Sequence, residues 1–85
     1  MSKRKSKYRL TLHNDDTTSF QHVIECLIHI CNHNYYQAGQ CATIVHNAGN
    51  CVIYETDQEE AEEVLDLLTD QGLIVTMEKK KRGQK

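Results

Sequence analysis

A chain of 85 residues with 39% hydrophobic and only 6% aromatic side chains, and with neither tryptophan nor proline, forms one small domain with an aliphatic core. It has no apolar run of membrane-spanning length and no secretory signal pattern, so we expect a cytoplasmic protein that makes no membrane contact. All ten Lys and Arg lie in residues 3–9 and 79–85, and all twelve acidic residues lie in residues 10–78. Because residues 10–78 carry only negative charge, they would repel phosphates, which argues against general nucleic-acid binding.

The first expected element is a strand over residues 7–13, preceded by a disordered arm at residues 1–6. Tyr8, Leu10 and Leu12 alternate with polar residues, as in a strand with one buried face. A short strand at this position begins the domain.

Two helices follow the strand. The first is expected over residues 19–32, because apolar residues recur there at helical spacing, with Thr18 as its N-cap and Gln21 completing a capping box. The second starts near Asn34 and ends near Gly49, which can take the left-handed conformation that closes a helix.

The remaining elements complete the order β-α-α-β-α-β. Residues 51–54 form a nearly all-apolar strand, which predicts a place in the middle of the sheet. A third helix, acidic on its outer face, begins at Thr56 or Asp57 and ends near residue 71, and residues 73–77 form the last strand. We therefore predict one α/β (α+β) domain over residues 7–78, with a three-stranded sheet covered by helices, and a solvated basic tail at residues 79–85.

Two adjacent carboxylates and an amide lie between the first strand and the first helix, at Asn14, Asp15 and Asp16. Ordinary turn chemistry accounts for such residues, because Asn and Asp bond their own backbone and suit a helix N-terminus. The alternative is an anionic cup that receives a cation, such as a metal, a lysine or a free α-amino group.

His46 lies at the end of the second helix, where the helix dipole alone favours it. Because the two helices of a hairpin run antiparallel, His46 is expected to face Asn14–Asp16. An apolar hollow would lie beside it, lined by Phe20, Val23, Ala42 and Val45. This arrangement suits a chain's N-terminus, whose α-amino group and first side chain sit together.

Metal and enzyme chemistry are less well supported. Four residues on one flank of the first helix could ligate zinc or copper, but this flank borders the apolar face: His22, Cys26, His29 and His33. A Cys–His pair is available from Cys41 or Cys51 with His46, yet no basic residue or glycine-rich elbow accompanies it. We expect no catalytic residue, no metal and no cofactor, and four reduced cysteines.

The motif residues together resemble the ClpS family of N-degron adaptors. They are Asn14-Asp15-Asp16-x-Thr18, Val23-Ile24, Ala38-x-Gln40, and Val45-His46 with Gly49 three residues on. The resemblance covers about residues 8–49. It implies a small α/β adaptor that binds N-terminal Leu, Phe, Tyr or Trp and hands the bearer protein to a Clp AAA+ unfoldase of ClpA or ClpC type and its peptidase.

The same resemblance implies roles for individual residues. Four would hold the peptide's α-amino group: Asn14, Asp15, Asp16 and His46. Thr18 would support the loop, and the side-chain pocket would be lined by Phe20, Val23, Ala42 and Val45, with Leu73 closing it. Ala42 is smaller than the Met or Leu often found there in the family, which implies a wider pocket.

A different class of function stays open from the sequence. The same fold could serve as a structural or interaction domain that docks through its acidic third helix or its basic tails. The ribosomal stalk protein's C-terminal domain has a similar layout, so the fold alone does not decide function. An interaction-only domain has no need of Asn14, Asp15, Asp16 and His46 together.

Overall fold

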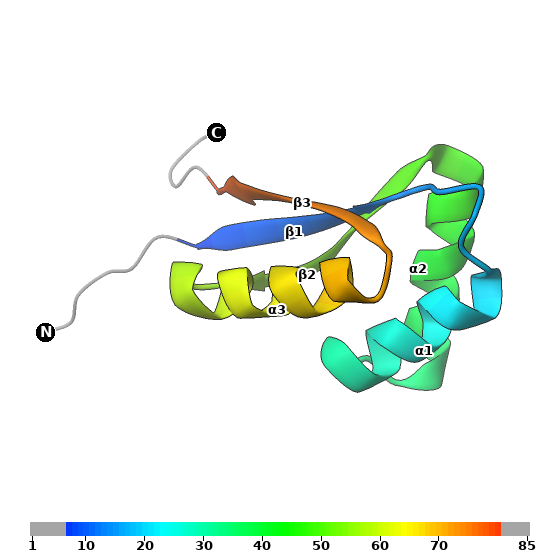
Figure 1. Ribbon diagram of the computed structural model, residues 1–85, viewed down its shortest axis with the longest axis horizontal. Coiled ribbons are helices and arrows are strands. Elements are labelled where there is room, and N and C mark those ends of the chain that lie inside the picture. Colours follow the sequence, from blue (N-terminus) through cyan, green and yellow to red (C-terminus); the bar gives the residue numbers. More distant parts are fainter. Residues whose placement is uncertain (1–6, 81–85) are drawn as a thin grey trace, which may run out of the picture.

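The computed structural model describes residues 7–80, so the predicted arm at residues 1–6 and the end of the basic tail, residues 81–85, lie outside the described part. Six elements follow in the predicted order β-α-α-β-α-β (Figure 1). They are β1 (Tyr8–His13), α1 (Phe20–Ile30), α2 (Tyr35–Ala48), β2 (Asn50–Thr56), α3 (Gln58–Asp70) and β3 (Ile74–Lys79). Within residues 7–80, no helix has the length and apolar character to cross a membrane.

The three strands form an antiparallel sheet in the order β2-β1-β3, so β1 is the central strand. The prediction that the apolar strand at residues 51–54 lies in the middle was therefore wrong. Although β2 is an edge strand, a bulge in the β1–β2 pairing lets Ile53 point into the core. Its neighbour Val52 stays 43% exposed.

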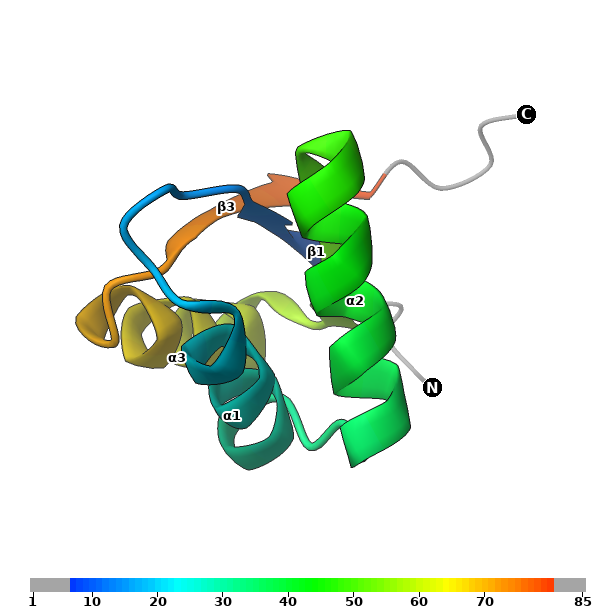
Figure 2. The same ribbon diagram turned by 90° about the vertical axis from the view of Figure 1, so that its right-hand side faces the viewer.

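All three helices contribute to one hydrophobic core. Figure 1 shows α3 running along one face of the sheet, and Figure 2 shows α1 and α2 as a hairpin at one end of it. The largest of the almost completely buried side chains come from β1, α1 and α3: Leu10, Leu12, Leu27 and Leu68. The predicted alternation in β1 is confirmed by the burial of Leu10 and Leu12.

The first helix is capped differently from the prediction. Ser19, and not Thr18, is the N-cap: its hydroxyl accepts a hydrogen bond from the His22 N–H at 3.1 Å. The helix ends at Ile30, before the predicted residue 32, because Asn32 adopts a left-handed conformation with φ 61°. Thr18 is thereby left free to bond within the preceding loop.

The second helix begins and ends as the sequence predicts. Asn34 is the N-cap in a complete capping box, since its side chain accepts from the Gln37 N–H at 2.7 Å and the Gln37 side chain accepts from the Asn34 N–H at 3.1 Å. Gly49 closes the helix with φ 99°, which a non-glycine residue adopts only with strain. These two caps fix the direction in which α2 presents its last turn.

Replacing Asn34 with alanine removes the capping bond from the Gln37 N–H to the Asn34 side chain, while the bond from the backbone N–H of residue 34 to the Gln37 side chain does not involve the substituted group. We expect the free energy of unfolding to fall by about 1 kcal/mol, within the range of about 0.5–2 kcal/mol for lost N-caps. Urea denaturation of Asn34→Ala measures this, with Gln40→Ala, an exposed mid-helix change, as the matched control. Equal stability of the two variants would show that the cap contributes nothing.

The third helix and last strand need only small corrections. Asp57 is the N-cap of α3, accepting from the Glu60 N–H at 2.9 Å, and Gly72 turns the chain with φ 88°. The strand β3 begins one residue later than predicted and runs two residues further, to Lys79, because the end of β3 pairs with Tyr8 and Arg9 at the start of β1. Leu73 lies just before β3 and is buried.

Candidate functional site

A pocket of about 410 Å³ lies at the end of the sheet where β1 ends, β3 begins, and the two hairpin helices meet it. The N–H of Asn14 donates to the carbonyl of Gly49 at 2.9 Å, which ties the loop after β1 to the end of α2. All ten residues assigned to the site from the sequence line this pocket: Asn14, Asp15, Asp16, Thr18, Phe20, Val23, Ala42, Val45, His46 and Leu73.

Asp15 is engaged by its own loop. Its Oδ1 accepts from the N–H of Thr17 at 3.0 Å and from the Thr17 hydroxyl at 2.9 Å, and its Oδ2 accepts from the Thr18 hydroxyl at 3.0 Å. A carboxylate offers about four acceptor positions, so most of the capacity of Asp15 is used here. Asp15 therefore shapes the loop, with Thr18 as its support.

These bonds lower the pKa of the Asp15 carboxyl below its ordinary value of 3.8, first through the Thr17 N–H and then through the Thr17 and Thr18 hydroxyls. A lowered folded-state pKa means that the stabilisation is fully present above about pH 4 and is lost as the pH falls through the folded pKa. We expect Thr17→Val with Thr18→Val to raise the Asp15 pKa part of the way towards 3.8, because the Thr17 N–H remains.

Carboxyl-carbon NMR titration of Asp15 measures this change. Thr43→Val removes an exposed hydroxyl on α2 and is the matched control, because it should leave the Asp15 titration unchanged. An unchanged Asp15 pKa in the double variant would contradict the bonding described for the loop.

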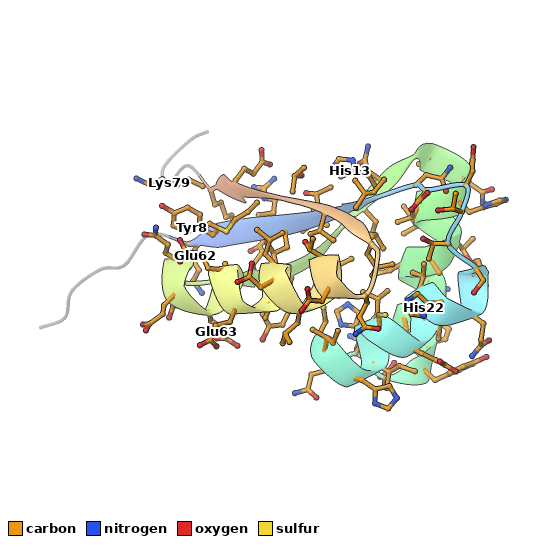
Figure 3. The ribbon with its side chains drawn as sticks, in the orientation of Figure 1. Tyr8, His13, His22, Glu62, Glu63 and Lys79 are labelled. Atoms are coloured by element: carbon orange, nitrogen blue, oxygen red, sulfur yellow. The ribbon has the colours of Figure 1, made fainter. Side chains whose placement is uncertain are left out.

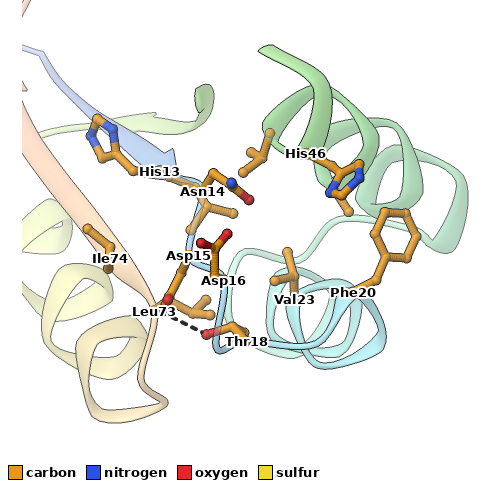
Figure 4. Close-up of a pocket in the computed structure, with 13 residues that line it drawn as sticks. His13, Asn14, Asp15, Asp16, Thr18, Phe20, Val23, His46, Leu73 and Ile74 are labelled. Atoms are coloured by element: carbon orange, nitrogen blue, oxygen red, sulfur yellow. Dashed lines mark hydrogen bonds between the residues drawn. The ribbon is translucent and has the colours of Figure 1, made fainter. Parts of the chain in front are cut away.

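Asp16 is placed differently from Asp15. Its side chain is exposed and makes no hydrogen bond or ion pair within residues 7–80. Figure 4 shows Asn14 and Asp16 on one side of the pocket and His46 across from them on α2. A carboxylate, an amide and an imidazole thus face one opening with their polar atoms available to a ligand.

The apolar part of the pocket comes from the helix hairpin. Val23 on α1 and the buried Ala42 and Val45 on α2 line it, and Phe20 is 49% exposed at its edge. Leu73, at the turn before β3, is buried beside the loop (Figure 4). An apolar side chain entering from the polar opening would meet these residues.

Three further lining residues were missed from the sequence: Leu12, His13 and Ile74. His13 and Ile74 face each other as cross-strand partners of β1 and β3, and the His13 ring lies 2.9 Å from the Thr76 hydroxyl. The alternation of β1 could have shown that Leu12 points inward. The β1–β3 pairing is a contact across more than sixty residues, and no local pattern reports it.

The histidine flank of α1 is used structurally. His22 Nε2 lies 2.9 Å from the carbonyl of Gln71, which joins α1 to the end of α3, and 3.6 Å from Cys26 Sγ. Among residues 7–80, no group of three or more His, Cys, Asp or Glu side chains is arranged to hold a metal ion.

Two thiols, the buried Cys31 and the half-buried Cys41, are poor nucleophiles. Burial raises the pKa of Cys31 to about 12, aided by the nearby Cys41 and Cys26. Burial also raises the pKa of Cys41 to about 11, together with its hydrogen bond to Cys51. At neutral pH these thiols carry their protons, whereas a catalytic cysteine needs the thiolate.

The fold and the pocket define a small α+β binding domain that offers anionic and imidazole acceptors beside an apolar hollow. The family model of the ATP-dependent Clp protease adaptor protein ClpS matches residues 3–76. The chain therefore belongs to the ClpS family of Clp protease adaptors.

Comparison with solved structures supports the same fold. The structure of Agrobacterium tumefaciens ClpS2 bound to L-phenylalaninamide is similar, with a TM-score of 0.76 and 24% sequence identity over 91% of this chain and 100% of that chain. The comparison with curated proteins found no match. The predicted fold class and family resemblance are thus confirmed.

Proposed function

We propose that this chain binds the free α-amino group and the bulky hydrophobic first side chain of N-degron proteins and delivers those proteins to an AAA+ unfoldase of the Clp protease, of ClpA or ClpC type. The observation that carries the proposal is the pocket itself: acceptors of Asp16 and His46, which have no hydrogen-bond partner within residues 7–80, stand beside an apolar hollow. Family membership supports the link to the Clp protease.

The amine contributes through charge-assisted hydrogen bonds. An ammonium group donates up to three bonds, and Asn14, Asp16 and His46 each offer an acceptor at the opening. Each charge-assisted bond is worth about 1.5–3 kcal/mol. Asp15 and Thr18 act mainly by holding the loop in place. An acetylated N-terminus has no charge, and it presents a single N–H to these acceptors.

The first side chain contributes by burial. Removing a Leu or Phe side chain from water is worth roughly 1.5–3 kcal/mol, and Val23, Ala42 and Val45 supply the apolar surface. The related ClpS2 binds L-phenylalaninamide, which carries a free α-amino group and a benzyl side chain. The small Ala42 leaves room for bulky first residues.

The proposal also includes the place of action. Four cysteines are free in the structure, as is usual in the reducing cytoplasm, and we place the adaptor there. The mechanism assigns no catalytic step to it, since the peptidase partner cleaves the substrate.

A reconstituted degradation assay tests delivery. A fluorescent reporter beginning with Phe is incubated with a Clp unfoldase and its peptidase, with and without this chain, beside the same reporter beginning with Gly. We expect the chain to accelerate loss of the Phe reporter and not of the Gly reporter. Equal rates for both reporters would overturn the proposed delivery.

A further inference from the structure

The pocket extends onto the sheet, beyond the residues proposed to bind the amine and the first side chain. Its lining includes His13, the last residue of β1, and Ile74, the first residue of β3. Figure 4 shows both of them on the other side of Asp16 from Val23, which lines the apolar hollow. We call this part of the pocket the sheet subsite: His13 and Ile74. It stays open when the first side chain of a peptide fills the hollow.

The sheet subsite offers a surface that is mainly apolar. His13 and Ile74 are direct cross-strand partners, and such residues have Cβ atoms about 4.5–5.5 Å apart on one face of the sheet. Ile74 is 48% exposed, and the partly buried His13 ring is held by Thr76, whose hydroxyl lies 2.9 Å from the ring Nε2. Figure 3 shows His13 at the end of the sheet nearest the helix hairpin, opposite the end where Lys79 lies. One ligand side chain can therefore contact the His13 ring and Ile74 together.

The bonding of a peptide's first residue directs the chain towards the sheet subsite. The first Cα is bonded to the α-amino nitrogen, to Cβ and to the carbonyl carbon. In the proposed function the nitrogen lies at the acceptors of Asn14, Asp16 and His46, and Cβ points into the hollow. The carbonyl carbon then leads away from the hollow, to the side where His13 and Ile74 lie (Figure 4). Because consecutive Cα atoms are about 3.8 Å apart, the second residue is still at the pocket.

We propose that the sheet subsite selects the second residue of the bound N-terminus and prefers a bulky aliphatic side chain such as leucine. This inference rests on the proposed function, because the amine and the first side chain set the direction of the chain. A leucine at the second position removes its own apolar surface and that of Ile74 from water, which favours binding in proportion to the area buried.

The polar groups around the sheet subsite favour this occupant over others. A polar second side chain exchanges a bond to water for one to the His13 ring, which gains little. An acidic side chain meets the like charge of Asp16, and no Lys or Arg lies within residues 10–78 to offset that charge. A basic side chain competes for Asp16 with the α-ammonium group, which the proposed function already places at that carboxylate. An aliphatic side chain uses the exposed surface of Ile74 without these costs.

Fluorescence anisotropy with labelled peptides that begin Phe-Leu, Phe-Asn and Phe-Lys, and are otherwise identical, tests the sheet subsite on the full chain at about 0.15 M salt. We expect Phe-Leu to bind about threefold to tenfold more tightly than Phe-Asn, whose second side chain has the same branched shape. Phe-Leu should also bind more tightly than Phe-Lys. Ile74→Thr keeps a β-branched residue on β3, and it should reduce the preference for Phe-Leu over Phe-Asn to less than about twofold.

Val52→Thr is the matched control, because Val52 is 43% exposed on β2 and does not line the pocket. It should keep the wild-type preference for Phe-Leu. The role of the sheet subsite is overturned if the wild-type chain binds Phe-Asn or Phe-Lys as tightly as Phe-Leu. It is also overturned if Ile74→Thr keeps the full preference, or if Val52→Thr loses it equally. Failure of all three peptides to bind the wild-type chain would instead overturn the proposed function itself.

Discussion

Asp16→Ala is expected to weaken binding of a peptide beginning with Phe by about 10- to 150-fold, the equivalent of one charge-assisted hydrogen bond of about 1.5–3 kcal/mol. Asp16 is the carboxylate at the pocket that has no partner within residues 7–80, so its acceptors are available to an ammonium group. Asp15, in contrast, is held by Thr17 and Thr18.

Asp66→Ala is the matched control for this change. Asp66 is exposed on α3 and does not line the pocket, so the variant loses the same side chain and the same charge elsewhere. It should bind the peptide like wild type. Isothermal titration calorimetry compares the three proteins, and wild-type affinity in Asp16→Ala would remove Asp16 from the site.

The second large effect is expected for Ala42→Phe. Ala42 is 3% exposed and lines the apolar part of the pocket, so a benzyl group there occupies the space proposed for the first side chain. The peptide then loses about 1.5–3 kcal/mol of burial, and affinity for peptides beginning with Leu or Phe should fall about 10- to 150-fold. Ala42→Met, which is more flexible, should cause a smaller loss.

Because overpacking can destabilise a core by about 1–3 kcal/mol, each Ala42 variant is also unfolded in urea. Thr43→Met serves as the control, since Thr43 is the next residue of α2 and is exposed outside the pocket. Retained binding by a folded Ala42→Phe protein would show that the first side chain lies elsewhere.

The sequence predicts the elements well because the local signals agree with one another. Both ends of α2 are fixed by local signals: the capping box of Asn34 and Gln37 at its start and the left-handed Gly49 at its end. Each signal acts within a few residues. Ser19 and Thr18 show the limit of such signals, because both can cap a helix. Ser19 is the cap, and the Thr18 hydroxyl bonds Asp15 instead.

The order of the strands depends on contacts between residues that are far apart in the sequence. An apolar run such as residues 51–54 suggests a central strand, yet the bulge at Ile53 buries one of its residues at an edge position. In the site, the residues of the loop after β1 and of the α1–α2 hairpin were predicted from the sequence to lie together, because α1 and α2 are neighbours in the sequence. His13 and Ile74 were missed because they meet only through the β1–β3 register.

The central claim is that the pocket reads a free α-amino group, and one comparison tests it most directly. Fluorescence anisotropy is recorded for a labelled peptide beginning with Phe or Leu and for the same peptide with an acetylated N-terminus. We expect the free peptide to bind and the acetylated one to lose binding by at least about tenfold, because at least one charge-assisted bond of about 1.5–3 kcal/mol is lost and acceptors such as Asp16 are left unpaired. Equal binding of the two peptides, or binding of neither across all bulky first residues, would contradict the account.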